Sequence, residues 1–483
     1  MCGIVGYIGH AGGDRDYFAL DVVLEGLRRL EYRGYDSAGV AMYADGDISW
    51  RKKAGKVAAL DAEIAARPLP DSVLGIGHTR WATHGGPTDL NAHPHVVDGG
   101  KLAVVHNGII ENFAELKSEL LHKGYNFVSE TDTEVAATLL GDVFHNEAAG
   151  DLTKAMQLTC ARLEGAFTLL AIHAEQADRI VAARRDSPLV IGLGEGENFL
   201  GSDVAAFVAY TKRAMEIDQD QAVMVSADKV VVSDFMGNIV PDPKTYTVYW
   251  DASAAEKGGW DSFMEIHEDP AAVQRTLLGR LDENGNINLD EVRIDEHDFK
   301  AIDKIIVIAC GTAAYAGMVA KYAIEHWVRI PVEVELAHEF RYRDPILTPR
   351  TLVVAISGET MDTLMALRHA REQGSKVLAI CNTQGASIPR ESDAVLYTHA
   401  GPEVAVASTK AFVAQITAAY VLGLYLAQVK GAMYRDEIAQ TLESLKDMPR
   451  KIQWILDTQT KTVQEAAEQM VDAKSFLFLG RHV

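Results

Sequence analysis

The second residue of the chain is a cysteine, and this position can give one residue two reactive groups. If Met1 is removed, which a small second residue permits, Cys2 carries both its thiol and a free α-amino group. Such an amine has a pKa of about 8, so a usable fraction is unprotonated at neutral pH. It can take the proton of the adjacent thiol, as in enzymes with an N-terminal nucleophile. Because a cysteine at position 2 is common by chance, catalysis requires partner groups elsewhere in the sequence.

Three later segments carry groups that an amide-cleaving cysteine needs. In Val-His-Asn-Gly-Ile-Ile, the Asn107 side chain precedes a glycine whose N–H can approach closely, which suits an oxyanion hole. Arg80 could clamp a carboxylate through its planar guanidinium. Asp132 follows Thr131 at a predicted helix start, where it could hold an ammonium group or where either residue could cap the helix. An α-amino acid substrate needs both a carboxylate clamp and an ammonium partner.

Two strand–glycine–helix turns in the second half of the chain could bind an anion. Cys310 is followed by Gly-Thr, and Ser357 is followed by Gly-Glu-Thr. Such turns direct backbone N–H groups and hydroxyls at an anion, and the helix N-terminus adds a favourable potential. Helix capping uses the same residue types, so a single turn says little. Two such turns on adjacent strands of one sheet favour a phosphate site.

The elements that must position these groups differ between the two halves of the chain. About the first 240 residues predict a strand-rich unit in which apolar β-branched runs alternate with turns. The predicted strands include residues 4–8, 101–105, 168–172 and 180–183, and helical patterns cover residues 17–30 and 133–144. Residues 237–295 are poorer in apolar runs, and we interpret them as a linker with one short helix over 271–281.

From about residue 296, strands and helices alternate. The apolar strands at residues 305–308, 352–356, 377–380 and 394–397 predict a parallel sheet covered by helices on both faces. Residues 411–428 carry no charge and nearly reach membrane-spanning length, but their alanines and polar residues favour a buried core helix. Residues 474–481 resemble residues 304–311 and predict the first strand of a second copy, so we expect further residues after Val483 in an intact protein.

Composition excludes several classes of protein. With 483 residues the chain is expected to form two to four domains. The formal net charge of −22 argues against a nucleic-acid partner, since phosphate backbones attract basic surfaces. The N-terminus lacks the pattern of a signal peptide. The four cysteines include no CxxC pair, which fits a reducing compartment, and we expect a cytoplasmic protein with no membrane partner.

Taken together, the motifs of the first half resemble class II glutamine amidotransferases. They are Met-Cys-Gly-Ile-Val-Gly at the start, Glu-Tyr-Arg-Gly-Tyr-Asp-Ser at 31–37, and the Arg80, Asn107 and Asp132 segments. The resemblance implies an α/β protein with an N-terminal nucleophile αββα sandwich over residues 1–236. It also implies Cys2 as the nucleophile and Trp81 on a loop that closes over glutamine. The implied oxyanion hole is Asn107 and Gly108, and the implied glutamine-binding residues are Arg80, Trp81, Thr83, His84 and Asp132.

Several histidines in these segments invite a metal-binding interpretation. They are His78, His84, His93, His95 and His106. Their spacing matches no helical zinc motif, and the resemblance explains their segments without a metal. We therefore expect neither a metal nor a cofactor.

The motifs of the second half resemble the sugar isomerase (SIS) domain of the glucosamine-6-phosphate synthase family. They are Cys-Gly-Thr at 310–312, Ser-Gly-Glu-Thr at 357–360 and Val-Ala-Ser-Thr-Lys-Ala-Phe at 406–412. The resemblance implies a first SIS domain over 296–440 and the start of a second over 441–483. It implies L-glutamine and D-fructose-6-phosphate as substrates, with ammonia channelled to the sugar, and a homodimer through SIS domains at full length. The implied sugar-phosphate-binding residues are Thr312, Ser357, Thr360, Val406, Ala407 and Ser408.

The sequence departs from that family pattern in three places. The loops at residues 356–360 and 263–266 are each about two residues short, so which family serine Ser357 represents stays open. The ring-opening His, the isomerising Glu and the C-terminal Lys of the family would all lie beyond Val483. We therefore expect glutamine hydrolysis and a partial sugar-phosphate site from this chain.

Two alternatives remain. The first is another class II amidotransferase, of the phosphoribosyl-pyrophosphate or asparagine-forming type, which the Cys-Gly-Thr and Ser-Gly-Glu-Thr turns argue against. The second is a non-catalytic sugar-phosphate sensor, which the Cys2 segment argues against.

Overall fold

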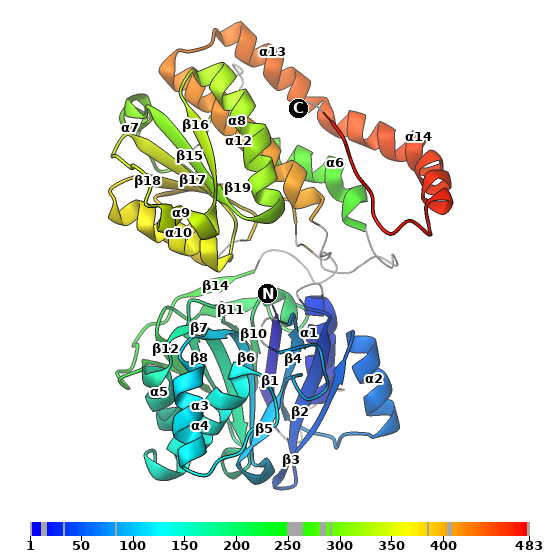
Figure 1. Cartoon of the computed structure of the whole chain (residues 1–483), viewed down its shortest axis with the longest axis vertical. Helices are drawn as coiled ribbons and strands as arrows, with labels where there is room; N and C mark the ends of the chain where they lie inside the picture. The colour runs from blue at the N-terminus through cyan, green and yellow to red at the C-terminus, as the bar shows by residue number, and fades with distance from the viewer. Residues whose placement is uncertain are drawn as a thin grey trace. The chain divides into compact units, whose positions relative to one another are not determined.

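A computed structural model of the chain forms two compact units, Met1–Glu256 and Lys257–Val483 (Figure 1). The structure describes residues 2–10, 17–31, 34–82, 85–248, 264–280, 286–289, 292–383, 386–401, 403 and 408–480.

Two antiparallel sheets form the centre of the described part of the first unit. One has the strand order β14-β11-β9-β10-β1-β4-β2-β3, and the other has the order β13-β12-β8-β7-β6-β5. The strands of the first sheet are β1 (Gly3–Gly9), β2 (Ser37–Ala44), β3 (Asp47–Ala54), β4 (Leu74–Arg80), β9 (Val190–Leu193), β10 (Glu197–Gly201), β11 (Arg213–Glu216) and β14 (Thr245–Thr247). Those of the second are β5 (His95–Val97), β6 (Leu102–Ile110), β7 (Gly165–His173), β8 (Ile180–Arg185), β12 (Gln221–Val225) and β13 (Val230–Asp234).

Helices cover the outer faces of both sheets (Figure 1). Helices α1 (Ala19–Leu30) and α2 (Val57–Ala66) pack on the first sheet. Helices α3 (Phe113–His122), α4 (Asp132–Asn146) and α5 (Leu152–Arg162) pack on the second. Between the sheets lies a core that joins Ile4 of β1 to Val105 of β6 and Leu170 of β7. These layers are helix, sheet, sheet and helix, so the predicted αββα sandwich is confirmed.

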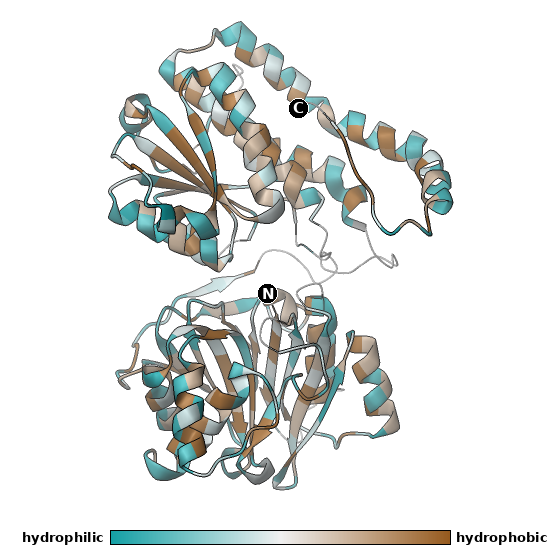
Figure 2. Ribbon diagram, viewed as in Figure 1, coloured by the Kyte–Doolittle hydropathy of each residue, from teal (hydrophilic) through white to brown (hydrophobic). Residues whose placement is uncertain are grey.

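The second unit is built on a parallel sheet. In the residues described there, the strand order is β16-β15-β17-β18-β19, and every neighbouring pair is parallel. Figure 2 shows these strands as mostly hydrophobic, as expected for a sheet buried on both faces. The strands are β15 (Lys304–Ala309), β16 (Val332–Leu336), β17 (Thr351–Ile356), β18 (Lys376–Cys381) and β19 (Ala394–Tyr397).

Helices lie on both faces of this sheet. Helices α6 (Met264–Leu277), α7 (Glu296–Ala301), α8 (Gly311–Val328) and α12 (Lys410–Lys430) share one core with it. Helices α9 (Ala337–Arg343), α10 (Met361–Glu372) and α11 (Ser387–Glu391) share the other. Helices α13 (Arg435–Lys446) and α14 (Met448–Gln469) follow. Helix α12 is long and apolar enough to span a membrane, but 56% of its most apolar window is buried in the unit, which supports its interpretation as a core helix.

The segment predicted as a linker contributes to both units. Strand β14 pairs with β11 in the first unit. Helix α6 begins at Met264, earlier than the predicted 271–281. The prediction placed the start of the helix after Pro270, which in the structure lies inside it. The Thr276 hydroxyl donates a hydrogen bond to the Thr398 carbonyl oxygen at 2.6 Å, which ties α6 to the loop after β19. The four domain ranges given above remain predictions.

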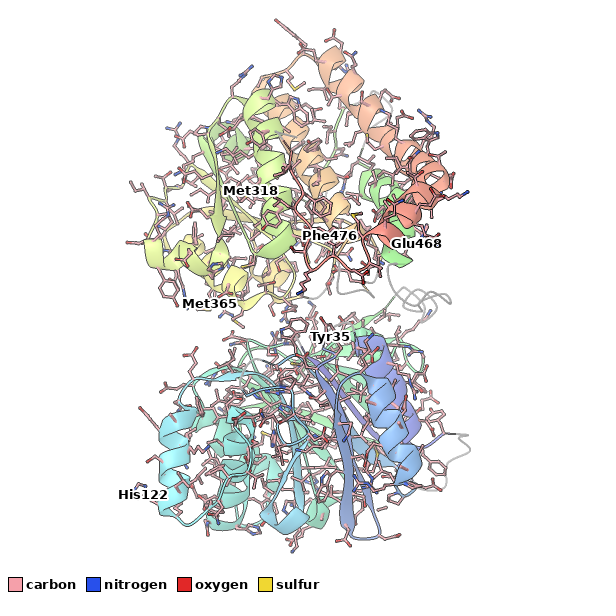
Figure 3. The ribbon with its side chains drawn as sticks, turned by 45° about the vertical axis from the view of Figure 1, so that its right-hand side comes forward. Tyr35, His122, Met318, Met365, Glu468 and Phe476 are labelled. Atoms are coloured by element: carbon pink, nitrogen blue, oxygen red, sulfur yellow. The ribbon has the colours of Figure 1, made fainter. Side chains whose placement is uncertain are left out.

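The segment at residues 474–480 differs from the sequence-based expectation. It carries no strand in the described structure, because no neighbouring strand pairs with it there. Its apolar side chains are exposed, and Phe476, labelled in Figure 3, has 57% of its surface accessible.

Candidate active site

Cys2 is held at the start of β1, which lies between β10 and β4 inside the eight-stranded sheet. The backbone N–H groups of the next two residues donate to hydroxyls, Gly3 to Thr79 at 3.2 Å and Ile4 to Ser202 at 3.1 Å. A Cβ atom at Gly3 would lie 2.6 Å from the Thr79 hydroxyl oxygen. Position 3 therefore accepts only glycine, and Cys2 is attached directly to a well-packed strand.

The Cys2 thiol sits at the end of β4. Its Sγ accepts a hydrogen bond from the backbone N–H of Trp81 at 3.2 Å. Burial raises the pKa of the Cys2 thiol, and the Trp81 N–H and the charge of Arg80 act in the opposite direction. Because the raised pKa keeps the group a thiol at neutral pH, attack on a carbonyl requires a base to take its proton.

Asn107 lies in β6 with its amide directed at the start of β1. Its Nδ2 donates to the Cys2 carbonyl oxygen at 3.0 Å. His78 of β4 contacts the Asn107 Oδ1 at 3.0 Å and the His106 carbonyl oxygen at 2.9 Å through its Nε2. Both of these atoms are acceptors, so Nε2 carries the proton and donates. His78 thereby fixes which way the Asn107 amide points.

From the sequence alone His78 is only a candidate metal ligand, and its contact with Asn107 was not predicted. Burial lowers the pKa of His78 to about 3, so the ring is neutral at physiological pH. A neutral ring that donates from Nε2 is not a base for Cys2. Its position two residues before Arg80, on the same face of a strand, was the available signal.

Gly108 is a second glycine that cannot be replaced without strain. Its φ is +120°, a conformation that residues with a Cβ rarely adopt. A Cβ atom there would lie 2.0 Å from the Ala166 carbonyl oxygen on the paired strand β7. The residue that follows Asn107 must therefore be a glycine.

Arg80 and Asp132 are both buried, 4% exposed each. The Arg80 guanidinium donates to the carbonyl oxygens of Gly85 at 3.1 Å and Gly86 at 3.2 Å. Burial lowers the pKa of Arg80, and the charge of Asp132 acts against this shift. The Asp132 carboxylate accepts from the Ile110 N–H at 2.8 Å. A cation and an anion therefore act on each other within the buried part of this site.

The structure shows which residue caps the start of α4. The Thr131 hydroxyl accepts from the Glu134 N–H at 3.2 Å, so Thr131 caps the helix. Asp132 is the first residue of α4, and its carboxylate is used outside the cap.

Trp81 begins the loop after β4. Its side chain is 40% exposed, and its ring meets Tyr35 edge to face with centroids 5.2 Å apart; Tyr35 is labelled in Figure 3. The Asp36 carboxylate accepts from the Ala82 N–H at 2.8 Å, which ties the loop to the start of β2. The predicted glutamine-binding residues Thr83 and His84 lie outside the described residues.

The remaining histidines of these segments form a buried, neutral group. His93 packs against His78 with ring centroids 4.1 Å apart, and its Nδ1 accepts from the His106 N–H at 3.3 Å. His95 and His106 each pair with a threonine hydroxyl, at 3.0 Å and 2.8 Å. Burial lowers the pKa of each of these rings. They support the strands around Asn107.

In the second unit, the two predicted anion-binding turns lie at the carboxyl ends of β15 and β17, which are paired in parallel. Thr312 is the second residue of α8 and is exposed. The Ser357 hydroxyl donates to the Thr360 hydroxyl at 2.8 Å and accepts from the Thr360 N–H at 3.3 Å. Parallel neighbours end at the same edge of a sheet, so both turns belong to one edge.

Ser408 lies just before α12 and is half-buried. Val406 and Ala407, which complete this predicted segment, lie outside the described residues. Lys410 of the same segment is buried and forms an ion pair with Glu268, with Glu265 3.8 Å away. This contact fixes the start of α12 against α6.

Known proteins match both units. Residues 78–209 match the glutamine amidotransferase domain family, and residues 299–425 match the SIS domain family. The glutamine–fructose-6-phosphate aminotransferase (isomerizing) of Corynebacterium efficiens is 70% identical over 487 residues, which cover 100% of this chain and 78% of that protein. The protein of the same name from Mycobacterium tuberculosis is 53% identical over 494 residues, with the same coverage.

One solved structure is also similar. It is the C-terminal domain of glucosamine-fructose-6-phosphate aminotransferase from Francisella tularensis, which is 38% identical and has a TM-score of 0.45. The match covers 47% of this chain and 64% of that chain. The family follows from the two aminotransferases, because their similarity extends over the whole of this chain. The chain belongs to the glutamine–fructose-6-phosphate aminotransferase (isomerizing) family of amidotransferase enzymes, and the family predicted from the sequence is confirmed.

Proposed function

We propose that the first unit hydrolyses L-glutamine to glutamate and ammonia, and that the second unit binds D-fructose-6-phosphate as the acceptor of this ammonia. The complete reaction yields glucosamine-6-phosphate and glutamate, which accords with the names of the relatives. The observation that carries the proposal is the chain of contacts from His78 through Asn107 to Cys2. A pre-oriented donor beside a cysteine is what acyl transfer requires.

Cys2 is proposed as the nucleophile. With Met1 removed, its α-amino group takes the thiol proton, and the thiolate attacks the side-chain carbonyl carbon of glutamine. The negative charge that develops on the carbonyl oxygen is stabilised by the Asn107 amide and the Gly108 N–H. Collapse of this intermediate, in which the α-ammonium group gives its proton to the leaving nitrogen, releases ammonia and leaves a thioester. Water then attacks the thioester, which releases glutamate and regenerates the thiol. The Asn107 Nδ2 carries two N–H groups, so one can stay on the Cys2 carbonyl oxygen while the other donates to the substrate oxygen.

The remaining residues of the first site are proposed to bind the α-amino acid end of glutamine. Arg80 holds the carboxylate, Asp132 holds the ammonium group, and Trp81 covers the substrate together with Thr83 and His84. Their support is the burial of the two charged groups and the exposed position of the Trp81 ring.

The second site is proposed to bind the sugar phosphate through Thr312, Ser357, Thr360 and Ser408, with backbone contacts from Val406 and Ala407. Its support is the position of the two turns at helix starts on one sheet edge. Moving a proton between C1 and C2 of the sugar needs a base near both carbons. Hydroxyls do not serve as that base at neutral pH, so these residues are assigned binding and not isomerisation.

We further propose a homodimer formed through the SIS domains of the full-length protein, and function in the cytoplasm without a metal or cofactor in catalysis. The support for a reducing compartment is that Cys2, Cys160, Cys310 and Cys381 are free thiols.

The test is an assay of glutamate release from glutamine, with amino sugar measured separately. Cys2→Ala, or any extension that remains on the N-terminus, should abolish glutamate release and leave fructose-6-phosphate binding unchanged. Cys160→Ala is the matched control, because this buried thiol lies in the same unit away from the site. Full hydrolysis by Cys2→Ala would exclude the proposed nucleophile, and glutamate without amino sugar is expected from residues 1–483.

A further inference from the structure

Three residues that can ligate a metal come together at the carboxyl edge of the parallel sheet. Cys310 follows β15 and directly precedes α8, as its N-cap residue. His338 lies in α9 after β16, and Asp362 lies in the first turn of α10 after β17. These three strands are adjacent and parallel, with β15 in the middle, so the fold brings the three side chains to one edge.

The ligand atoms of this trio lie only slightly farther apart than in a tetrahedral metal site. The Cys310 Sγ and the His338 Nδ1 are 3.8 Å apart, and both lie within 4.8 Å of an Asp362 carboxylate oxygen. Bonds of about 2.3 Å to sulfur and about 2.0 Å to nitrogen or oxygen place neighbouring tetrahedral ligands roughly 3.5 Å apart. Small side-chain rotations therefore close the trio around one ion. We propose that Cys310, His338 and Asp362 bind Zn²⁺.

The surroundings of His338 support this assignment. A histidine that ligates through one ring nitrogen commonly has a carboxylate near the other. The Glu339 carboxylate lies 3.8 Å from the His338 Nε2, on the side away from Cys310. An Nε2–H facing this carboxylate leaves the Nδ1 lone pair directed to the metal.

A second trio in the first unit, Asp98, His145 and His173, differs from the Cys310 trio in its hydrogen bonds. There both imidazoles contact the same carboxylate oxygen through Nε2, at 2.8 Å and 3.1 Å. The His173 Nδ1 accepts from the Glu175 N–H at 3.2 Å, so its proton sits on Nε2, where a metal would have to bind. Binding a cation there would cost existing hydrogen bonds. The first-unit trio is therefore a hydrogen-bonded cluster and serves as an internal control.

The donor set selects the ion. A thiolate and an imidazole favour Zn²⁺ over Mg²⁺ and Ca²⁺, which prefer oxygen ligands alone. Three protein ligands leave a fourth position for water, because His338 and Asp362 are exposed and Cys310 is half-buried. Binding releases the thiol proton to solvent, so it weakens as the pH falls. This proposal concerns ion binding alone and does not depend on the proposed function.

The experiment uses the full chain carrying Cys2→Ala, which removes the other thiol that is not fully buried. Metal-free protein is titrated with Co²⁺, and Zn²⁺ is then added to displace it. We expect one equivalent of Co²⁺ with a thiolate-to-metal charge-transfer band. Cys310→Ser should abolish the band, and His338→Gln and Asp362→Asn should each weaken Zn²⁺ binding at least tenfold. Glu339→Gln should weaken it by about tenfold, as is typical for a residue behind a ligand.

His145→Gln is the matched control, since it alters an exposed histidine of the first-unit trio. Its Zn²⁺ affinity should equal that of the parent protein. The proposal is overturned if the charge-transfer band persists in Cys310→Ser, or if His338→Gln leaves the Zn²⁺ affinity unchanged. Loss of binding in His145→Gln would also overturn it, by locating the ion in the first unit. Circular dichroism of each variant confirms that a lost signal is not lost folding.

Discussion

The two units build their candidate sites in opposite ways. In the first unit the groups lie within paired strands, and His78, Asn107 and Arg80 are at most 5% exposed and hydrogen-bonded to other groups of the unit. In the second unit the groups lie in turns beyond the strand ends, where Thr312 is exposed and Ser357 is half-buried.

This difference follows from what each site must do. Cleaving an amide creates charge on one oxygen for a moment, and donors stabilise it best when they are already fixed and kept from water. Holding a phosphate needs N–H groups and hydroxyls directed at a permanent charge, which helix starts supply without burial. We therefore expect changes in the first site to reduce turnover, and changes in the second to reduce affinity.

The largest expected contrast is between Asn107→Ala and Ser357→Ala. Loss of one oxyanion donor lowers turnover by about 100- to 1000-fold, so Asn107→Ala should do this to glutamate release with little change in the glutamine KM. Ser357→Ala should leave glutamate release intact and weaken fructose-6-phosphate binding by about tenfold, the usual cost of one hydrogen bond to a charged group. Steady-state glutaminase kinetics and calorimetric binding measure the two effects. A change in Asn107→Ala confined to KM would assign it to substrate binding.

The rigidity of the first site can be tested with two glycines that share a positive φ. Gly108→Ala meets the Ala166 carbonyl oxygen and should destabilise the first unit by at least about 3 kcal/mol, because strain adds to lost β6–β7 pairing. Gly124→Ala has φ +92° and no atom within 4 Å of the new Cβ. It should cost only about 1 kcal/mol. Urea unfolding of the two variants measures the difference, and equal costs would mean that the strand contact at Gly108 relaxes.

The smallest contrast is in pH dependence, which should have opposite signs in the two units. Burial lowers the pKa of His78 from 6.5 to about 3, so the stability of the first unit should fall as the pH drops below 6.5. Burial, with repulsion from Glu265 and Glu268, raises the pKa of Asp269 from 3.8 to about 6. The protonated form is favoured in the folded state, so this stabilisation is present below pH 3.8 and lost as the pH rises through 6.

Replacing Asp269 isolates its contribution. Asp269→Asn should stabilise the second unit by about 2 kcal/mol at pH 8 and change little at pH 4. Hydrogen exchange of peptides from α6 and from β4 reports the two units separately. If Asp269→Asn were destabilising at pH 8, the carboxylate would be held by a partner that outweighs its burial.

Much of the second unit could be predicted from the sequence, because its parallel strands are continuous apolar runs. All four predicted strands are present within β15, β17, β18 and β19. The strand that was missed, β16, lies at the sheet edge, and its Glu333 and Glu335 alternate with valines. These carboxylates pair with Lys304 at 3.0 Å and Arg343 at 2.7 Å. Charged residues are common in edge strands, and they interrupt the apolar run by which the other strands were recognised.

In the first unit the motifs supplied most residues of the candidate site, but not the contacts that orient them. Asn107, Arg80 and Asp132 were found because their side chains have an evident chemistry. The role of His78 depends on its being opposite Asn107 across the two sheets, which no local pattern encodes. Helices α2, α3 and α5 were also not predicted. Each packs only one side on a sheet, and its apolar residues therefore form a weaker sequence pattern than the continuous apolar strands.

The position of β1 inside its sheet also affects how the protein is made. Its neighbour β10 pairs through Val5 and Gly201, so β1 lacks one of its two partners until about 200 residues have been synthesised. At 5–20 residues per second this takes about 10–40 s. Throughout that interval the first residues are outside any completed sheet and accessible to an aminopeptidase. The removal of Met1 that the proposed mechanism requires is therefore expected during translation, before β1 is enclosed by its second neighbour.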